Sequence, residues 1–234
     1  MLIKPTHSTV LSDPEHRYAL VAQKLQKGTS VLDVGGYNDR RKLIARVIGD
    51  DFQYTAINTS GAWYDDKTKY TKYDGLRLPF ENQQFEVAIS VDTLEHIDHK
   101  DRQLFVTEMT RVGQKVVLVA PFSDPSRSTL EPSFARISKV LGVEVKPSIE
   151  EHIKKGLPTL NDIEAYFVGQ NFAIEFGTDY TKFWQMIFLQ LVVNVIGRKR
   201  SKKTNELVQK IFEARLQQAN SLDKSKAYRV IVST

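Results

Sequence analysis

The sequence predicts an α/β fold: a doubly wound, seven-stranded and mostly parallel sheet covered by helices, with a helical insertion before the last strand. Short runs rich in β-branched residues alternate with longer segments of helical pattern, which is typical of strand-helix-strand crossover units. Some of these runs, such as Val116–Ala120, are apolar throughout, as expected of strands buried on both faces. A length of 234 residues with 41% hydrophobic residues suits one globular domain over 1–234.

Local signals support each element in the first half of the chain. Ser12 and Glu15 form a capping box, Pro14 suits a first helical turn and Gly28 can end a helix, so a helix is predicted over 13–27. Strands are then expected at 31–34, 54–57, 71–73, 86–91 and 116–120, with helices near 39–48 and 100–112.

The pattern weakens after Pro121, and residues 123–160 are expected to form a loop or lid. A helix from Asn161 to about Gly169 is predicted because Asn161 and Glu164 can cap its first turn. Two late strands, at 173–176 and 228–232, complete the sheet, and a helical insertion over 180–225 separates them.

Composition excludes several classes of protein. The chain has no cysteine, which excludes a disulfide framework, a thiolate metal site and a cysteine nucleophile. The first residues contain no apolar run of signal-peptide length, so we expect a cytoplasmic protein. The net charge of +5 is local, because five basic residues between 198 and 203 account for all of it. A nucleic-acid partner is therefore not expected from the charge.

The candidate site lies after the strands, because a doubly wound sheet binds its ligand outside their carboxyl ends. Asp33, Gly35, Gly36 and Tyr37 follow the first strand. Paired glycines let the backbone approach a ligand, and a carboxylate accepts hydrogen bonds from an ammonium group, so this turn suits an aminoacyl ligand. The phosphate-binding patterns GxxxxGK[ST] and GxGxxG are absent from the sequence. A plain strand-to-helix turn is the alternative.

Two further polar positions follow the next strands. Asn58 ends the second strand, where a side chain can reach ribose hydroxyls. Asp74, which precedes Gly75 after the third strand, can accept a hydrogen bond from an exocyclic amine such as that of adenine. Turn formation by Asn58 and an Asx turn at Asp74 are the structural alternatives.

Taken together, the segment from Val31 to Phe122 resembles the class I S-adenosylmethionine-dependent methyltransferases of the small-molecule branch. VLDVGG resembles the first cofactor motif, YTAIN the second, YDGLRLPFENQQFEVAIS the third and fourth, VDTLEHI the segment after the fourth strand, and KVVLVAPF the fifth strand. The resemblance implies a Rossmann-like fold, S-adenosyl-L-methionine as cofactor and methyl transfer as the reaction. It places Asp33, Gly35, Gly36 and Tyr37 near the methionine portion, Asn58 at the ribose, Asp74 and Gly75 at the adenine, and Ser90 and Asp92 along the cofactor.

The chain departs from the family pattern at several positions. Tyr37 and Asp39 replace the later glycines of D-x-G-x-G-x-G, Asn58 replaces the usual acid, and Glu86 replaces the usual Asp. These departures leave open a non-catalytic partner protein with a methyltransferase fold.

Three residues are candidates for catalysis. His96 follows the fourth strand, where the family approaches its acceptor, and an imidazole is a suitable base at neutral pH. Glu151 and His152, followed by Gly156-Leu157-Pro158, resemble the EHxxxGLP segment of methyltransferases encoded with bacterial surface-glycan enzymes. That resemblance implies that Glu151 and His152 approach a sugar hydroxyl. For His96, a hydrogen-bonded turn histidine is the alternative.

A metal centre is not expected. The nearby acids and imidazoles of Glu95, His96, Asp98 and His99 lie in one turn, which does not guarantee that their ligand atoms converge.

The insertion at 180–225 allows two interpretations. Eleven of the fourteen residues of 183–196 are apolar, too few to span a bilayer. The segment is expected to form a lid or a homodimer helix packed against 205–218. The alternative is peripheral contact of 183–203 with the inner membrane surface, where basic residues attract anionic head groups.

We therefore expect methylation of a hydroxyl group on a carbohydrate or another small molecule. A nucleic-acid methyltransferase is disfavoured, because Ser90-Val91-Asp92-Thr93 lacks the Asn/Asp-Pro-Pro-aromatic pattern of amino-directed enzymes and the C5 route requires a cysteine.

Overall fold

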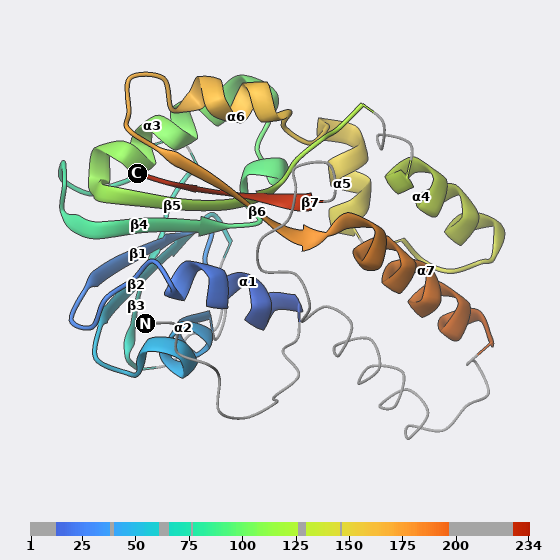
Figure 1. Ribbon diagram of the computed structural model, residues 1–234, viewed down its shortest axis with the longest axis horizontal. Coiled ribbons are helices and arrows are strands. Elements are labelled where there is room, and N and C mark those ends of the chain that lie inside the picture. Colours follow the sequence, from blue (N-terminus) through green and yellow to red (C-terminus); the bar gives the residue numbers. More distant parts are fainter. Residues whose placement is uncertain are drawn as a thin grey trace.

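The sheet has the predicted doubly wound order. The computed structural model describes residues 13–37, 40–60, 66–75, 77–125, 130–145, 147–196 and 227–234. Its strands are β1 (Ser30–Val34), β2 (Gln53–Asn58), β3 (Thr68–Lys72), β4 (Phe85–Val91), β5 (Gly113–Pro121), β6 (Ala173–Asp179) and β7 (Ala227–Ser233). They form one sheet in the order β3-β2-β1-β4-β5-β7-β6 (Figure 1). Strands β1 to β5 are parallel, whereas β7 runs antiparallel to both β5 and β6.

Helices cover both faces of the sheet. They are α1 (Asp13–Ala22), α2 (Arg40–Ile48), α3 (Arg102–Val112), α4 (Leu130–Val140), α5 (Pro147–Lys155), α6 (Leu160–Tyr166) and α7 (Tyr180–Ile196), with short 3-10 turns η1 (Leu94–His96) and η2 (His99–Asp101). Figure 1 shows α3 and α6 on one face and α1 and α2 on the other. Strand order reverses between β1 and β4, and doubly wound sheets bind their ligands in a crevice outside the carboxyl ends of the strands at such a point.

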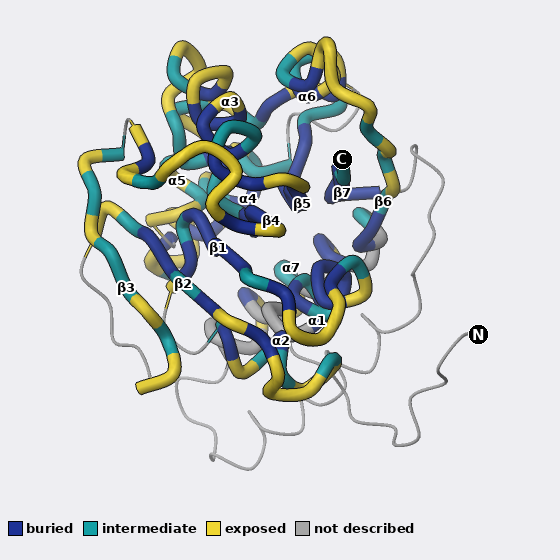
Figure 2. Tube along the Cα trace, turned by 90° about the vertical axis from the view of Figure 1, so that its left-hand side faces the viewer, coloured by how far each residue is buried: buried dark blue, intermediate teal, exposed yellow. Residues whose placement is uncertain are grey.

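The core consists of two apolar layers because side chains of one strand point alternately to opposite faces. On β1, Leu32 packs in the layer beneath α3 and α6, whereas Val31 packs in the layer beneath α1 and α2. Figure 2 shows the central strands largely buried and the edge strand β3 mostly half-buried or exposed. The strands that lead to the sheet edge are therefore buried in the core.

Several predicted boundaries were wrong. Helix α1 ends at Ala22 instead of residue 27, and Gly28 takes the left-handed conformation, with φ +79°, in a later turn. Strand β3 begins at Thr68, three residues earlier than predicted, because its pairing with β2 sets its limits. The stretch 123–160, predicted to form a loop or lid, contains α4 and α5.

The cap of α6 also differs from the prediction. Thr159, not Asn161, is the N-cap: its hydroxyl accepts a hydrogen bond from the amide of Asp162, whose carboxylate accepts one from the amide of Thr159. Ser12, half of the first predicted capping box, lies outside the described residues, as does the segment 205–218.

Helix α7 begins the predicted insertion and packs against α4 and β7. Its Phe183 and Trp184 form an aromatic cluster with Phe134 of α4 and Tyr228 of β7. Among the described helices, none combines the length and apolar character needed to cross a bilayer.

Candidate active site

Asp33, at the end of β1, is completely buried and held by two tyrosines. Its Oδ2 accepts hydrogen bonds from the hydroxyl of Tyr18, at 2.9 Å, and from that of Tyr54. Burial raises the pKa of Asp33 to about 6, although both hydroxyls oppose this shift. Among the described residues, Asp33 Oδ1 has no hydrogen-bond partner. A carboxylate with an unused acceptor fits the ammonium group of an aminoacyl ligand.

Two glycines follow Asp33 and allow the turn to lie against its neighbours. Gly35 has φ +86°, and a Cβ there would lie 2.2 Å from Thr93 Oγ1. At Gly36 a Cβ would lie 2.6 Å from Asp33 Cγ. The side-chain amide of Asn58 donates to the carbonyl oxygens of both glycines at 3.3 Å. Asn58, the predicted ribose ligand, therefore also fixes the glycine turn.

The predicted adenine residues lie at the same edge of the sheet. Asp74, which follows β3, is exposed. Gly75 has φ +89°, and a Cβ there would lie 3.1 Å from Cγ2 of Thr59, which follows β2. The neighbouring Tyr73 has a pKa raised to about 12 by burial and by the charge of Asp74. The ends of β2 and β3 thus meet beside the glycine turn. Tyr37, at the end of that turn, is exposed.

Ser90 and Asp92, at the end of β4, both have structural partners. Buried Ser90 donates to the carbonyl oxygen of Val34 at 2.9 Å, which ties β4 to β1. Asp92 accepts from Arg229 Nη2 at 3.0 Å and also from Arg17. Burial alone would raise the pKa of Asp92, but the two guanidinium groups outweigh it and hold this pKa at about 2. Asp92 therefore stays charged.

The three predicted catalytic residues meet beyond η1. His96 Nδ1 lies 2.8 Å from Glu151 Oε2, and the imidazole centroids of His96 and His152 are 4.9 Å apart. Lys155 links Glu151 to His96: its ammonium group pairs with Glu151 at 2.9 Å and donates to the carbonyl oxygen of His96 at 2.6 Å. Burial lowers the pKa of His96 despite the opposing effect of Glu151, which favours the neutral imidazole.

His152 has its own carboxylate partner, Glu131 of α4. The distance from His152 Nδ1 to Glu131 Oε1 is 3.2 Å, and the hydroxyl of Tyr228 donates to the same oxygen at 3.2 Å. Sequence reasoning missed Glu131 and Tyr228, as it missed Arg17 and Arg229. These partners come from separate elements and meet only through the fold.

A cavity of about 200 Å³ opens beside this histidine. His152 and Glu131 line it together with the aromatic rings of Tyr180, Trp184 and Tyr228. An apolar wall with a few polar groups is the usual character of a small-molecule site. This cavity lies on the predicted acceptor side.

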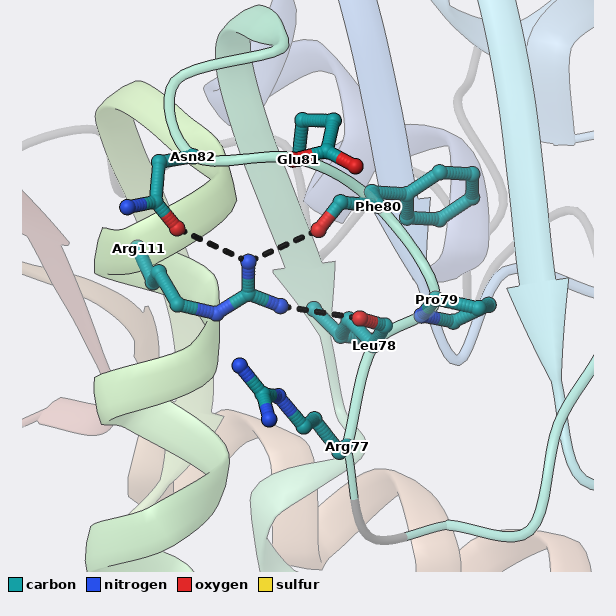
Figure 3. Close-up of a pocket in the computed structure, with 7 residues that line it drawn as sticks. All are labelled: Arg77, Leu78, Pro79, Phe80, Glu81, Asn82 and Arg111. Carbon is teal, nitrogen blue, oxygen red and sulfur yellow. Dashed lines mark hydrogen bonds between the residues drawn. The ribbon is translucent and has the colours of Figure 1, made fainter.

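A second cavity, of about 350 Å³, lies near the amino ends of β4 and β5 (Figure 3). There Arg111 donates to the carbonyl oxygens of Leu78 and Phe80 and to Asn82 Oδ1, at 2.7 to 3.1 Å. It also pairs with Glu108 at 2.7 Å. The guanidinium group clamps the loop before β4, so this cavity is a structural feature away from the crevice.

Comparison with known proteins agrees with this arrangement. The family model described as "Methyltransferase domain" matches residues 32–118. No curated protein matches the chain significantly. Among solved structures, the chain is similar to the YcgJ protein from Bacillus subtilis, with a TM-score of 0.52 and 14% identity over 93% of this chain and 96% of that one.

Two other solved structures are similar. A putative sarcosine dimethylglycine methyltransferase from Galdieria sulphuraria has a TM-score of 0.55 and 13% identity over 94% of this chain and 83% of that one. A putative methyltransferase from an antibiotic biosynthesis pathway of Anabaena variabilis has a TM-score of 0.55 and 12% identity over 93% and 99%. At such identities the similarity establishes the fold. Residues 32–118 thus match a methyltransferase domain, and the seven-stranded sheet has the Rossmann-like fold of the class I S-adenosylmethionine-dependent methyltransferases.

Proposed function

We propose that this enzyme methylates a hydroxyl group of a carbohydrate or another small polar molecule. The observation that carries the proposal is the pair of histidines, His96 and His152: each is held by a carboxylate, and His152 lines an aromatic-walled cavity. Hydroxyl acceptors need a base during methyl transfer, and a histidine oriented by a carboxylate is well suited to that role. Aromatic rings can pack against the apolar faces of a sugar while polar groups orient its hydroxyls.

The cofactor would lie across the carboxyl ends of β1, β2 and β4. Asp33 would accept a hydrogen bond from the methionine ammonium group beside Gly35, Gly36 and Tyr37. Asn58 would reach the ribose, Asp74 and Gly75 the adenine, and Ser90 with Asp92 would line the central portion. The unused oxygen of Asp33 and the shared edge of β2 and β3 support this placement.

His152 is the better placed base because it lines the cavity. When neutral, it donates from Nδ1 to Glu131, and its Nε2, which is buried and has no hydrogen-bond partner among the described residues, would accept the proton of a hydroxyl that reaches it. Bound S-adenosylmethionine supplies an electrophilic methyl group. In that reaction the acceptor hydroxyl would lose its proton to His152. Glu131 then stabilises the imidazolium, as a carboxylate does beside a catalytic histidine.

Two measurements test the proposal. Isothermal titration should detect binding of S-adenosylmethionine and of S-adenosylhomocysteine, and an assay of S-adenosylhomocysteine release should identify a carbohydrate acceptor. In single turnovers, His152→Gln should slow methyl transfer by about 10²–10⁴-fold, the usual contribution of a general base, without altering cofactor affinity. The exposed His99 supplies the matched control, His99→Gln, which should behave as the parent.

A chain that binds no cofactor at millimolar concentration would contradict the proposal and favour a non-catalytic partner protein. One observation favours that second candidate: the side-chain amide of Asn58 is already bonded to Gly35 and Gly36. Cofactor binding with transfer to a non-hydroxyl acceptor alone would instead refute the acceptor class.

The predicted homodimer and the predicted membrane contact stay predictions. Helix α7 exposes Leu189 and Val192, which supports a role for this helix in contacts outside the domain. The basic run that would contact anionic lipids lies outside the described residues. Sedimentation velocity tests the homodimer. Co-flotation with vesicles that contain or lack anionic lipid tests the membrane contact.

A further inference from the structure

We propose that Glu95, His96 and His152 form a binding site for one divalent transition-metal ion of the zinc type. One ligand atom from each of the three side chains lies within 4.8 Å of the other two. Glu95 and His96 come from η1, and His152 comes from α5, more than fifty residues later in the chain. The site therefore exists only because α5 packs against η1 in the fold.

Two ligand atoms of this cluster are buried and unused. Glu95 is only 1% exposed, and within the described part of the chain neither its Oε2 nor His152 Nε2 has a hydrogen-bond partner. The distance from His152 Nε2 to Glu95 Oε1 is 3.9 Å. Leaving a buried polar atom without a partner is unfavourable. A bound cation would give both groups a partner.

The surroundings of the two imidazoles match those of metal ligands. A histidine that binds a metal usually donates its other ring nitrogen to a carboxylate or carbonyl, which fixes its tautomer and orientation. Here His96 Nδ1 faces Glu151 at 2.8 Å and His152 Nδ1 faces Glu131 at 3.2 Å. Each carboxylate leaves the Nε2 atom of its histidine as the remaining ligand. Both histidines thus face a carboxylate through Nδ1, whereas a histidine that only stabilises a turn would not need a matching second pair.

The ligand set also fits the coordination chemistry. Two imidazoles with one carboxylate suit Zn²⁺ and similar first-row ions, and tetrahedral bonds of about 2.0–2.2 Å place ligand atoms roughly 3.3–3.5 Å apart. The observed 3.9 Å between His152 and Glu95 is close to that spacing. Three protein ligands leave a fourth position open, as in catalytic rather than structural zinc sites.

These three ligands differ from the cluster of acids and imidazoles that follows the fourth strand in the sequence. Asp98 and His99 take no part: Asp98 pairs with Lys155 at 3.2 Å, and His99 is exposed. His152 provides the third ligand, and it lies too far from Glu95 and His96 in the sequence for a local motif to predict it. The inference goes beyond the proposed function, because metal binding uses the Nε2 lone pair that a histidine base needs. The metal-free base and the metal-loaded site are thus alternative states of one cluster.

Zinc titration of the full chain, freed of metal by chelator and dialysis, tests the inference. We expect one Zn²⁺ per chain by calorimetry and by metal analysis. Glu95→Gln and His152→Gln should each weaken binding at least tenfold. Glu131→Gln, which removes only the orienting carboxylate, should weaken it about 10–100-fold. His99→Gln is the control and should leave the affinity unchanged.

Titration of the same samples with S-adenosylmethionine separates this result from the proposed function. A variant that binds the cofactor as the parent does is folded, so its loss of zinc affinity supports the site. If His152→Gln loses the cofactor as well, His96→Gln serves in its place. The inference would be overturned if the parent chain shows no saturable zinc binding, or if the Glu95 and His152 variants bind zinc as tightly as the parent does. Either result counts whether or not the cofactor binds.

Discussion

Replacing Asp33 by Asn should stabilise the protein at neutral pH while weakening cofactor binding. The carboxylate is completely buried between the hydroxyls of Tyr18 and Tyr54, and its pKa is raised from 3.8 to about 6, chiefly by desolvation. A carboxylate that ionises less readily in the folded state costs stability wherever it is charged. Asn keeps an oxygen that can accept from both hydroxyls and carries no charge to bury.

The size and sign of the effect follow from this pKa. Below pH 3.8 the carboxyl is protonated in both states, so it costs nothing. Between pH 3.8 and about 6 the unfolded chain ionises first, and stability falls as the pH rises. Above pH 6 the full cost applies; at about 1.4 kcal/mol per pH unit, the difference between 3.8 and about 6 corresponds to about 3 kcal/mol.

Thermal and urea unfolding from pH 3.5 to 8, without cofactor, provide the assay. At pH 7.5 Asp33→Asn should gain about 3 kcal/mol, or about 6–12 °C in Tm for a domain of this size, and the gain should vanish near pH 4. Asp66→Asn, at an exposed acid, is the control and should change stability little. The reasoning fails if Asp33→Asn is no more stable than the parent at pH 7.5, or if both proteins share one pH dependence.

Three further outcomes are expected. Gly35→Ala should weaken S-adenosylmethionine binding at least tenfold by calorimetry, because φ +86° and the 2.2 Å approach to Thr93 force the turn to move; unchanged affinity would contradict this. Asp92→Asn should cost about 2 kcal/mol in urea at pH 7, because the folded pKa of about 2 supplies stability that is present above pH 3.8 and lost as the pH falls towards 2; equal stability at pH 7 would count against the arginine pairs. Thr159→Ala should lose about 1 kcal/mol by removing the cap of α6, whereas Asn161→Ala should lose little; the reverse order would restore the cap inferred from sequence.

Local signals predicted β1 and β4 well. Strand β1, its glycine turn and β4 lie within a residue of their predicted limits, because buried strands and tight turns are encoded by neighbouring residues. Helices α4 and α5 are amphipathic helices within the stretch that was predicted to be a loop or lid.

The sequence by itself determined the fold class and the order of the strands along the chain, since both depend on hydrophobic period and turn chemistry over a few residues. Tertiary structure alone decided the partners. Asp92 meets Arg17 and Arg229 across 75 and 137 positions, and His152 meets η1 only because α5 folds back onto it. Such pairs form where separate elements pack together, and that packing depends on the path of the whole backbone.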